Sequence, residues 1–500
     1  MDDKSAMRRT SVLRNGLYNI GAQAVRGMVS LVSIPILIGL LGLREYGVWS
    51  LAYAVLMLVT ISEAAFSVTA TVFLSRDLAG NDSAGAANTL GFLLSGASIV
   101  SGILGTFLWT FSPVLVRALV HFSTADRFTA SQALKIAGLA VSALVIQRTL
   151  IGIEQSFDRY ATVSVLDLSQ SLLTNGGAIV VAWFGGKAVE LMKWQVAAVV
   201  ILTVVHSCVV WNLLRGRRLY VGWCTEKATR MLKYSAGAWT SAIGSAVFGQ
   251  CDQLVVGGLL GAPMLGVYAA ITGITSKINS FSGAAVQPLV PALNGGNRSR
   301  ISVVSRLQEA AQLNAFIAIE IGVILYILAR WVTQIMIPAS SSQVVIGLQI
   351  AAIIYAVYSL NAPGHFVLFS VGAAGLNAAI TLCSAIVSLA LIFEGARHFG
   401  LLGAIAGNVA YLGTVSMVVL GLRKINAGSI RTYVRWIAVP LLCLAVAFLF
   451  GILVGDQLWL RCGFVVVQSA ALMLWFVREQ SQFGSFAPEL WRIANDRGLN

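Results

Sequence analysis

Apolar segments long enough to cross a membrane recur along almost the whole of this 500-residue chain. A helix needs about 20 apolar residues to cross a hydrocarbon core that is about 30 Å thick. Only 11% of the residues are charged, whereas roughly a quarter are charged in soluble domains. Only helices or closed barrels satisfy their backbone hydrogen bonds in lipid, and these segments lack the two-residue alternation of barrel strands. The sequence therefore predicts an all-α polytopic membrane protein.

The apolar segments divide into about 14 predicted spans. Their approximate limits are 15–40, 46–73, 87–111, 131–153, 160–184, 194–214, 234–260, 265–293, 307–336, 344–369, 376–394, 402–421, 433–455 and 458–477. No predicted loop exceeds about 20 residues, which leaves no room outside the membrane for a catalytic or nucleotide-binding domain. The chain also lacks a phosphate-binding loop of the form GxxxxGKS or GxxxxGKT. We therefore expect a protein that is not an enzyme and has no catalytic residues.

Basic residues gather in alternate predicted loops. With the N-terminal segment 1–14 in the cytoplasm, most of the 34 Lys and Arg residues fall on the cytoplasmic side. The principal ones are Lys4, Arg8, Arg9, Arg14, Arg215, Arg217, Arg218, Lys227, Arg230, Lys233, Arg298, Arg300 and Arg306. This positive-inside pattern predicts that both termini, the linker 215–233 and the tail 478–500 are cytoplasmic, and that the loop 112–130 is periplasmic.

The overall charge and the cysteines suggest no other function. The excess of 34 basic over 20 acidic residues is explained by membrane topology, so we expect no nucleic-acid partner. The six cysteines form no CxxC or metal-spaced cluster. We interpret them as small packing residues and expect no metal site.

A string from the first predicted hairpin returns in the second half of the chain. LLGLREYGVWSLA at 40–52 resembles LLGAPMLGVYAAI at 259–271. The copies share two glycines and a valine at one constant offset: Gly42, Gly47 and Val48 in the first, Gly261, Gly266 and Val267 in the second. The offset covers six predicted spans, which indicates two parallel halves, 15–214 and 234–421, followed by two additional spans in 433–477. The alternative is a chance similarity between two hairpin turns.

Five stretches together resemble a known family. They are IPILIGLLGLREYGVW at 34–49, EAAF at 63–66, CDQLVVGGLLGAPMLGVY at 251–268, QPLVPALN at 287–294 and FGLLGAIAGNVAYL at 399–412. They resemble the polysaccharide flippase branch of the multidrug, oligosaccharidyl-lipid and polysaccharide exporter superfamily, over roughly residues 15–425. Ala65 departs from the family pattern, which commonly has glycine at that position.

The resemblance implies two six-helix lobes around a central cavity that opens alternately to the two sides of a bacterial cytoplasmic membrane. It implies that the protein flips a polyprenyl-pyrophosphate-linked oligosaccharide to the periplasmic leaflet for O-antigen, exopolysaccharide or capsule synthesis. The cavity of such flippases is typically basic, whereas related drug exporters often favour an acidic one. The implied partners are membrane lipids and the polysaccharide polymerase and chain-length machinery.

Charged side chains at bilayer depth cost at least about 2.5 to 3.5 kcal/mol each, so each one requires a reason. Those inside predicted spans are Arg26, Glu63, Lys135, Arg148, Asp167, Asp252, Lys277, Glu309 and Glu320. Arg26 and Lys277 lie near mid-membrane, one in each half, and we predict that they contact the pyrophosphate. Arg offers a planar fork for phosphate oxygens and Lys a compact charge. The alternative is that each neutralises a nearby acid, for instance Arg26 with Glu63.

The candidate ion-coupling groups are Asp252, Glu63 and Glu320. A carboxylate in a wet cavity can exchange H⁺ or Na⁺ with one side of the membrane at a time, and the choice of ion stays open. Asp252 and Glu63 also occupy acidic positions of the family pattern, with charge compensation as the alternative role. No organic cofactor is expected. The isolated His206 and His365 are interpreted as packed polar residues.

Prolines in two spans mark the points where helices are expected to bend. The hinge candidates are Pro35 in the first span and Pro288 and Pro291 in the eighth. Glycines of the seventh span are further candidates, with close helix packing as their alternative role.

Two other functions remain open from sequence. A cation-coupled multidrug exporter would use the same architecture with an acidic cavity. A membrane oligosaccharide polymerase or ligase would handle the same lipids, but such enzymes generally carry a large periplasmic loop, and the longest one predicted here, 112–130, is small.

Overall fold

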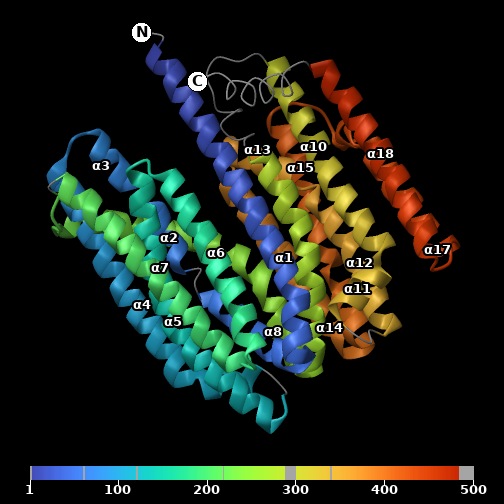
Figure 1. Cartoon of the computed structure of the whole chain (residues 1–500). Coiled ribbons are helices and arrows are strands. Elements are labelled where there is room, and N and C mark those ends of the chain that lie inside the picture. The colour runs from blue at the N-terminus through green and yellow to red at the C-terminus, as the bar shows by residue number, and fades with distance from the viewer. Residues whose placement is uncertain are drawn as a thin grey trace, which may run out of the picture. The chain divides into compact units, whose positions relative to one another are not determined.

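A computed structural model describes residues 3–59, 62–119, 122–217, 219–287, 300–337 and 341–483. Side chains within these ranges are described except at 3–24, 62–65, 119, 237–248, 300–303 and 480–483. The described part is helical and contains no strand (Figure 1). The prediction of an all-α protein is confirmed.

The first half of the described chain contains most of the long helices. Its elements are α1 (Asp3–Val59), α2 (Ser62–Thr69), the π-helix η1 (Ala70–Leu74), α3 (Ser75–Ala79), α4 (Ser83–Leu119), α5 (Thr124–Ser156), α6 (Tyr160–Trp183), α7 (Ala188–Gly216) and α8 (Thr225–Val286).

The remaining helices are shorter on average. They are α10 (Arg300–Ile327), α11 (Ala329–Met336), α12 (Ser342–Ser359), α13 (Ala362–Ser370), α14 (Ala374–Gly407), the 3-10 helix η2 (Asn408–Val415), α15 (Ser416–Lys424), α16 (Ile430–Trp436), α17 (Ala438–Leu453) and α18 (Leu458–Phe483).

Ten described helices are long and apolar enough to cross a membrane, or eleven if the bent pair α16 and α17 forms one span. Three of the longest helices, α1, α8 and α14, contain a glycine with non-helical dihedral angles: Gly42, Gly261 and Gly400. Each of these glycines lies where the sequence predicts a turn between two spans. The chain is a multi-pass membrane protein, and the count of 14 spans stays a prediction.

The helices extend further into the predicted loops than hydropathy indicates. The loop expected at 112–130 is largely helical, because α4 continues to Leu119 and α5 begins at Thr124. The hydroxyl of Ser123 accepts the backbone N–H of Asp126 at 3.2 Å and donates to its carboxylate at 2.7 Å. Such N-terminal capping stabilises a helix start that apolar content cannot reveal. The linker 215–233 is likewise shortened, since α8 begins at Thr225.

The chain folds into two compact units. The first comprises Met1–Ala270, Met336–Pro338 and Thr381–Gly407, and the second comprises Ile271–Ile335, Ala339–Ile380 and Asn408–Asn500. These units differ from the predicted halves 15–214 and 234–421, and those halves stay a prediction.

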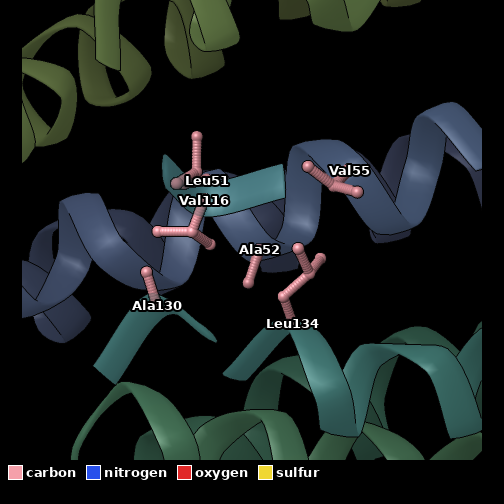
Figure 2. Close-up of a pocket in the computed structure, with 6 residues that line it drawn as sticks. All are labelled: Leu51, Ala52, Val55, Val116, Ala130 and Leu134. Atoms are coloured by element: carbon pink, nitrogen blue, oxygen red, sulfur yellow. The ribbon is translucent and has the colours of Figure 1, made fainter. Parts of the chain in front are cut away.

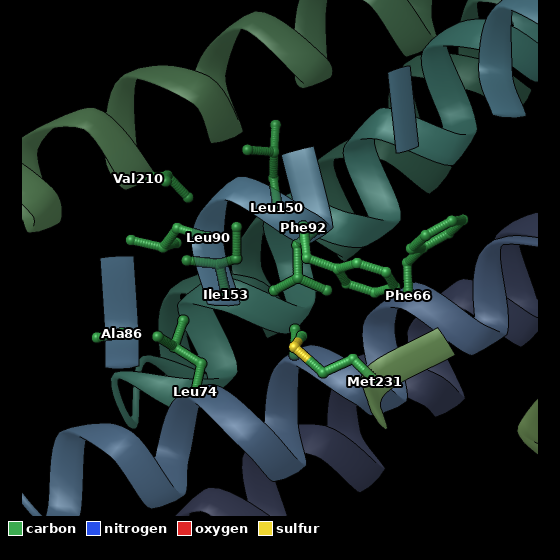
Figure 3. Packing of buried hydrophobic residues seen from close by; sticks show 11 residues of the cluster. Phe66, Leu74, Ala86, Leu90, Phe92, Leu150, Ile153, Val210 and Met231 are labelled. Carbon is green, nitrogen blue, oxygen red and sulfur yellow. The ribbon is translucent and has the colours of Figure 1, made fainter. Parts of the chain in front are cut away.

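In the first unit, α5 packs against both α4 and α7. Its last turns belong to an apolar cluster with residues of α2, η1, α4, α7 and α8 (Figure 3). The start of α8 is also attached to this unit, because the Lys227 ammonium contacts the Asp77 carboxylate at 2.7 Å and the Gly85 carbonyl at 2.8 Å. The basic linker is therefore bound to the first predicted cytoplasmic loop.

In the second unit, α10 packs against α12, α17 and α18. The buried Arg461 of α18 donates to the Ile327 carbonyl at the end of α10 at 2.9 Å and pairs with Asp456 at 2.7 Å. Further along the same helices, the Gln312 amide donates to Glu479 at 2.9 Å. The two C-terminal spans, predicted as an addition to the repeats, are thus an integral part of this unit's packing.

Candidate functional site

The repeated string forms the same backbone structure twice. Gly42 has φ 74° and ψ 161°, and Gly261 has φ 83° and ψ 175°. A positive φ of this size is readily adopted only by glycine. The sequence match at 40–52 and 259–271 therefore reflects one hairpin geometry used twice, which opposes the alternative of chance similarity.

The two repeated hairpins also touch each other within the first unit. A Cβ atom on Gly47 would collide with the Ala262 carbonyl and would lie 2.9 Å from the backbone nitrogen of Gly266. A Cβ atom on Gly266 would in turn collide with the Leu43 carbonyl and would lie 3.3 Å from the nitrogen of Gly47. Equivalent glycines of the two repeats thus allow the backbones to meet at a distance that no larger residue permits.

Arg26 is paired with an acid that the sequence analysis did not assign to it. One guanidinium nitrogen of Arg26 lies 3.2 Å from the Asp167 carboxylate of α6, and about a quarter of the Arg26 side chain is exposed. Nearby on the same two helices, Ser33 donates to Asn175 at 3.2 Å. The first helix is therefore joined to α6 by polar contacts, with Asp167 as the partner that the structure provides for Arg26.

Lys277 differs from Arg26 because it has no acidic partner among the described residues. It lies in the part of α8 that follows the Gly261 kink, inside a membrane-length apolar helix, and its side chain is partly buried. An ammonium group in such a position is costly unless an anion or water accompanies it. Lys277 is therefore available to an anionic ligand.

Asp252 lies before the same kink, and only 5% of it is exposed. Its carboxylate accepts the Tyr268 hydroxyl at 2.8 Å and the Gln253 backbone N–H at 2.8 Å. Tyr268 follows the kink, so this hydrogen bond joins the two arms of the second hairpin. Asp252 is therefore buried and held by two hydrogen bonds, and its ion-coupling role stays a prediction.

Glu320 lies on α10, and its carboxylate accepts a hydrogen bond from Ser469 of α18. This contact places Glu320 at the packing surface between the second unit's central helix and the last span. Its ion-coupling role stays a prediction. The side chain of Glu63 lies outside the described residues, as do Pro288 and Pro291.

Pro35 lies within α1, and the non-helical dihedral angles of that helix are at Gly42. Proline prevents one backbone hydrogen bond but fits helical φ, whereas a positive φ ends the helical path. The observed break is therefore at the glycine, and the hinge role of Pro35 stays a prediction.

Sequence reasoning missed one ionisable pair altogether. Glu154 lies just beyond the fourth predicted span, 131–153, and the sequence indicates that His206 is an isolated polar residue. The structure brings the Glu154 carboxylate of α5 within 2.7 Å of the His206 imidazole of α7, and neither side chain is exposed. The only sequence signal is that each is an ionisable residue inside or next to a predicted span, and this does not identify the partner.

The pocket drawn in Figure 2 is not suited to a phosphate group. It lies between α1, α4 and α5 and is lined by aliphatic side chains: Leu51, Ala52, Val55, Val116, Ala130 and Leu134. Such a lining provides no hydrogen-bond donor for an anion. No group of three or more His, Cys, Asp or Glu residues suited to a metal occurs in the described part of the chain.

The fold of this multi-pass membrane protein is shared with solved membrane transporters. The structure is similar to the lipid II flippase MurJ in an inward closed conformation, with a TM-score of 0.73 and 13% identity over 93% of this chain and 99% of that one. An inward-facing multidrug resistance MATE transporter of the MOP superfamily has a TM-score of 0.64 and 14% identity over 82% of this chain and 98% of its own. A Vibrio cholerae MATE transporter has a TM-score of 0.61 and 13% identity over 83% of this chain and 96% of its own.

Sequence comparison identifies the family. Residues 12–295, more than half of the chain, match the model of the polysaccharide biosynthesis protein family. This protein therefore belongs to that family, and the resemblance noted from its motifs is confirmed. A comparison with curated protein sequences gave no match.

Proposed function

We propose that this protein flips a polyprenyl-pyrophosphate-linked oligosaccharide from the cytoplasmic to the periplasmic leaflet by alternating access. The observation that carries the proposal is Lys277, a cation in a membrane-length helix with no acidic partner among the described residues. A pyrophosphate would supply the missing negative charge, whereas a cationic drug would be repelled. Membership of the polysaccharide biosynthesis family supports a sugar-linked substrate.

Deletion of the gene in its host tests the proposal directly. We expect a polyprenyl pyrophosphate oligosaccharide to accumulate in the cytoplasmic leaflet, with loss of the surface O-antigen, exopolysaccharide or capsule. The measurement is mass spectrometry of lipids extracted from spheroplasts with and without a membrane-impermeant oxidant, which modifies only the sugars of the periplasmic leaflet. Unchanged lipid-linked sugars together with increased sensitivity to cationic drugs would instead identify a multidrug exporter. Accumulation in the periplasmic leaflet would instead indicate a defect in a polymerase or ligase.

We also propose a bacterial cytoplasmic-membrane location with both termini and the linker 215–233 in the cytoplasm. In a variant whose native cysteines are replaced, a membrane-impermeant maleimide applied from outside should label Thr124→Cys and leave Glu226→Cys unlabelled. Both positions are exposed in the structure. Labelling with the reverse pattern would invert the orientation that the basic loops predict.

Asp252 is the proposed ion-coupling residue. Asp252→Asn preserves the shape that accepts the Tyr268 hydroxyl but removes the titrating group. In vesicles supplied with a fluorescent polyprenyl pyrophosphate disaccharide, we expect the variant to bind the probe but to lose stimulation by an imposed Na⁺ or pH gradient. Glu394→Gln, which changes an exposed acid, is the control. Equal stimulation of Asp252→Asn and the parent would leave Asp252 with a structural role only.

A further inference from the structure

Glu154 and His206 form an ionisable pair inside the first unit. The carboxylate oxygen Oε1 of Glu154 lies 2.7 Å from Nδ1 of His206, and both side chains have no exposed surface. The pair joins α5 to α7, which pack against each other along their length. A contact of this length is typical of a charge-assisted hydrogen bond.

Each member of the pair has a second polar atom that makes no hydrogen bond within the described part of the chain. These atoms are Oε2 of Glu154 and Nε2 of His206, and both are buried. Apolar residues of the cluster drawn in Figure 3 lie close to the pair along its own helices: Leu150 and Ile153 on α5, and Val210 on α7. The pair thus contains two buried polar atoms that are not engaged by the described side chains.

Other charged groups on the packed helices are engaged elsewhere. Arg26 of α1 pairs with Asp167 of α6, Arg44 of α1 with Asp126 of α5, and Lys193 with Glu190 on α7. The Asp77 carboxylate beside η1 is paired with Lys227. The remaining charged groups on α4, α5 and α7 form no ion pair with Glu154 or His206: Arg117, Arg127, Lys135, Arg148 and Arg215.

The charge of this pair depends on a single proton. With neutral imidazole and ionised carboxylate, the buried pair carries one net negative charge, which is unfavourable away from water. Adding one proton gives an imidazolium and a carboxylate, or a neutral imidazole and a carboxylic acid, and either form has no net charge. Because both side chains are buried, the number of protons that the pair holds depends on whether water can reach it.

From this geometry we propose that Glu154 and His206 form a proton-binding site that loads and releases one H⁺ during the transport cycle. Hydronium on one side of the membrane supplies the proton, and a water molecule that reaches the pair from the other side accepts it. No covalent bond other than N–H or O–H changes. The coupling of this proton to transport rests on the flippase function proposed above, whereas proton binding itself does not.

A change in the shape of η1 could alter the access of water to Glu154 and His206, because η1 packs against α5. Gly152 and Ser156 lie on the opposite face of α5, where Gly152 packs against the backbone of Ser67 and Ser156 donates to the Ala70 carbonyl at 2.9 Å. Ala70 begins the π-helix η1, and π-turns are frequent where a helix must change shape for function. A movement of η1 would therefore act on α5 directly behind Glu154.

Proton binding can be tested without any substrate. The protein contains four histidines, so ¹⁵N-histidine labelling in lipid nanodiscs gives few signals, and His206→Gln assigns the one of interest. We expect the ¹⁵N signals of the His206 imidazole to respond to pH, and Glu154→Gln to alter that response. Glu394→Gln removes the carboxylate that lies 3.4 Å from the exposed His398. This control should leave the pH response of the His206 signals unchanged. A His206 signal of one protonation state throughout would overturn the proposal.

Coupling is tested with variants that separate hydrogen bonding from titration. In Glu154→Gln/His206→Gln the two amides can still hydrogen-bond, but neither titrates. With the fluorescent polyprenyl pyrophosphate disaccharide, we expect downhill flipping and any Na⁺ stimulation to persist, and stimulation by a pH gradient to be lost. The exchanged variant Glu154→His/His206→Glu should restore it, and Glu394→Gln/His398→Gln should behave like the parent.

The two proposals fail in different ways. Full stimulation of Glu154→Gln/His206→Gln by a pH gradient would overturn the coupling role of the pair. A parent protein that moves none of the probe would overturn the flippase function, and the titration of His206 would then decide the proton site by itself.

Discussion

Replacing Lys277 with alanine is expected to abolish transport while the protein remains in the membrane at the parent level or above. Lys277 has no acidic partner among the described residues, so its removal leaves no carboxylate unpaired and removes a costly charge from bilayer depth. A hydrogen bond between charged groups contributes about 1.5 to 3 kcal/mol. Affinity for the pyrophosphate probe should therefore fall about 10- to 150-fold.

The measurement combines three readouts: binding of the fluorescent probe, its flipping in vesicles, and the thermal unfolding midpoint. Lys277→Arg should retain substantial transport because it retains the charge. Lys193→Ala, at an exposed lysine beside Glu190, is the matched control and should leave all three unchanged. A fall in unfolding temperature for Lys277→Ala would indicate a structural role instead.

The role of Arg26 requires a different mutagenesis experiment because Arg26 is paired with Asp167. Arg26→Ala alone leaves that carboxylate without its ion-pair partner, so a loss of transport would be ambiguous. The double variant Arg26→Ala/Asp167→Ala removes both charges. We expect it to recover protein level but not transport, because a phosphate contact of Arg26 would still be absent. Recovery of transport would assign Arg26 to the packing of α1 against α6.

Enlarging Gly47 or Gly266 is expected to force the two repeated hairpins apart. A Cβ atom at either position would collide with backbone atoms of the opposing hairpin, and backbone cannot move aside as a side-chain end does. Overpacking of this kind costs about 1 to 3 kcal/mol. This corresponds to a change of about 5- to 150-fold in the equilibrium between hairpins in contact and hairpins that are separated. Gly47→Ala and Gly266→Ala should therefore each reduce transport and increase water access to the contact.

Access can be followed with Leu265→Cys, introduced next to Gly266 at a position with no exposed surface, in a protein whose native cysteines are replaced. A membrane-impermeant maleimide should label it faster when Gly47→Ala is also present. Gly39→Ala is the matched control, because a Cβ atom at Gly39 on the same helix meets nothing within 4 Å. Equal labelling with both substitutions would show that the glycine contact does not control the opening.

Several features of the fold follow from local sequence because they depend on residues close together in the chain. Membrane-length apolar segments predict spanning helices, and the repeated LLG strings predict two similar turns. The structure confirms the helical class and shows the same dihedral pattern at Gly42 and Gly261. Loop lengths were less accurate, since the capped start of α5 near Ser123 is polar and is not detected by hydropathy.

Pairing between charged residues was harder to predict. The sequence offers Glu63 as one possible partner of Arg26, and the side chain of Glu63 lies outside the described residues. The structure pairs Arg26 with Asp167, more than a hundred residues away. Glu154 was placed outside a span, yet it is fully buried against His206. These pairs depend on the rotation and depth of two helices relative to each other, and a single sequence contains no direct signal for either.

The sequence by itself determined that most of the chain lies in lipid, that it is helical, that it repeats one hairpin, and to which family it belongs. Each of these conclusions depends on composition or on motifs read along the chain. The tertiary structure decided which charges are neutralised and which are not. Arg26, Lys277 and Glu154 are all costly at bilayer depth when considered singly. Only the packing of neighbouring helices gives Arg26 an acid, gives Glu154 a histidine, and leaves Lys277 without an acidic partner among the described residues.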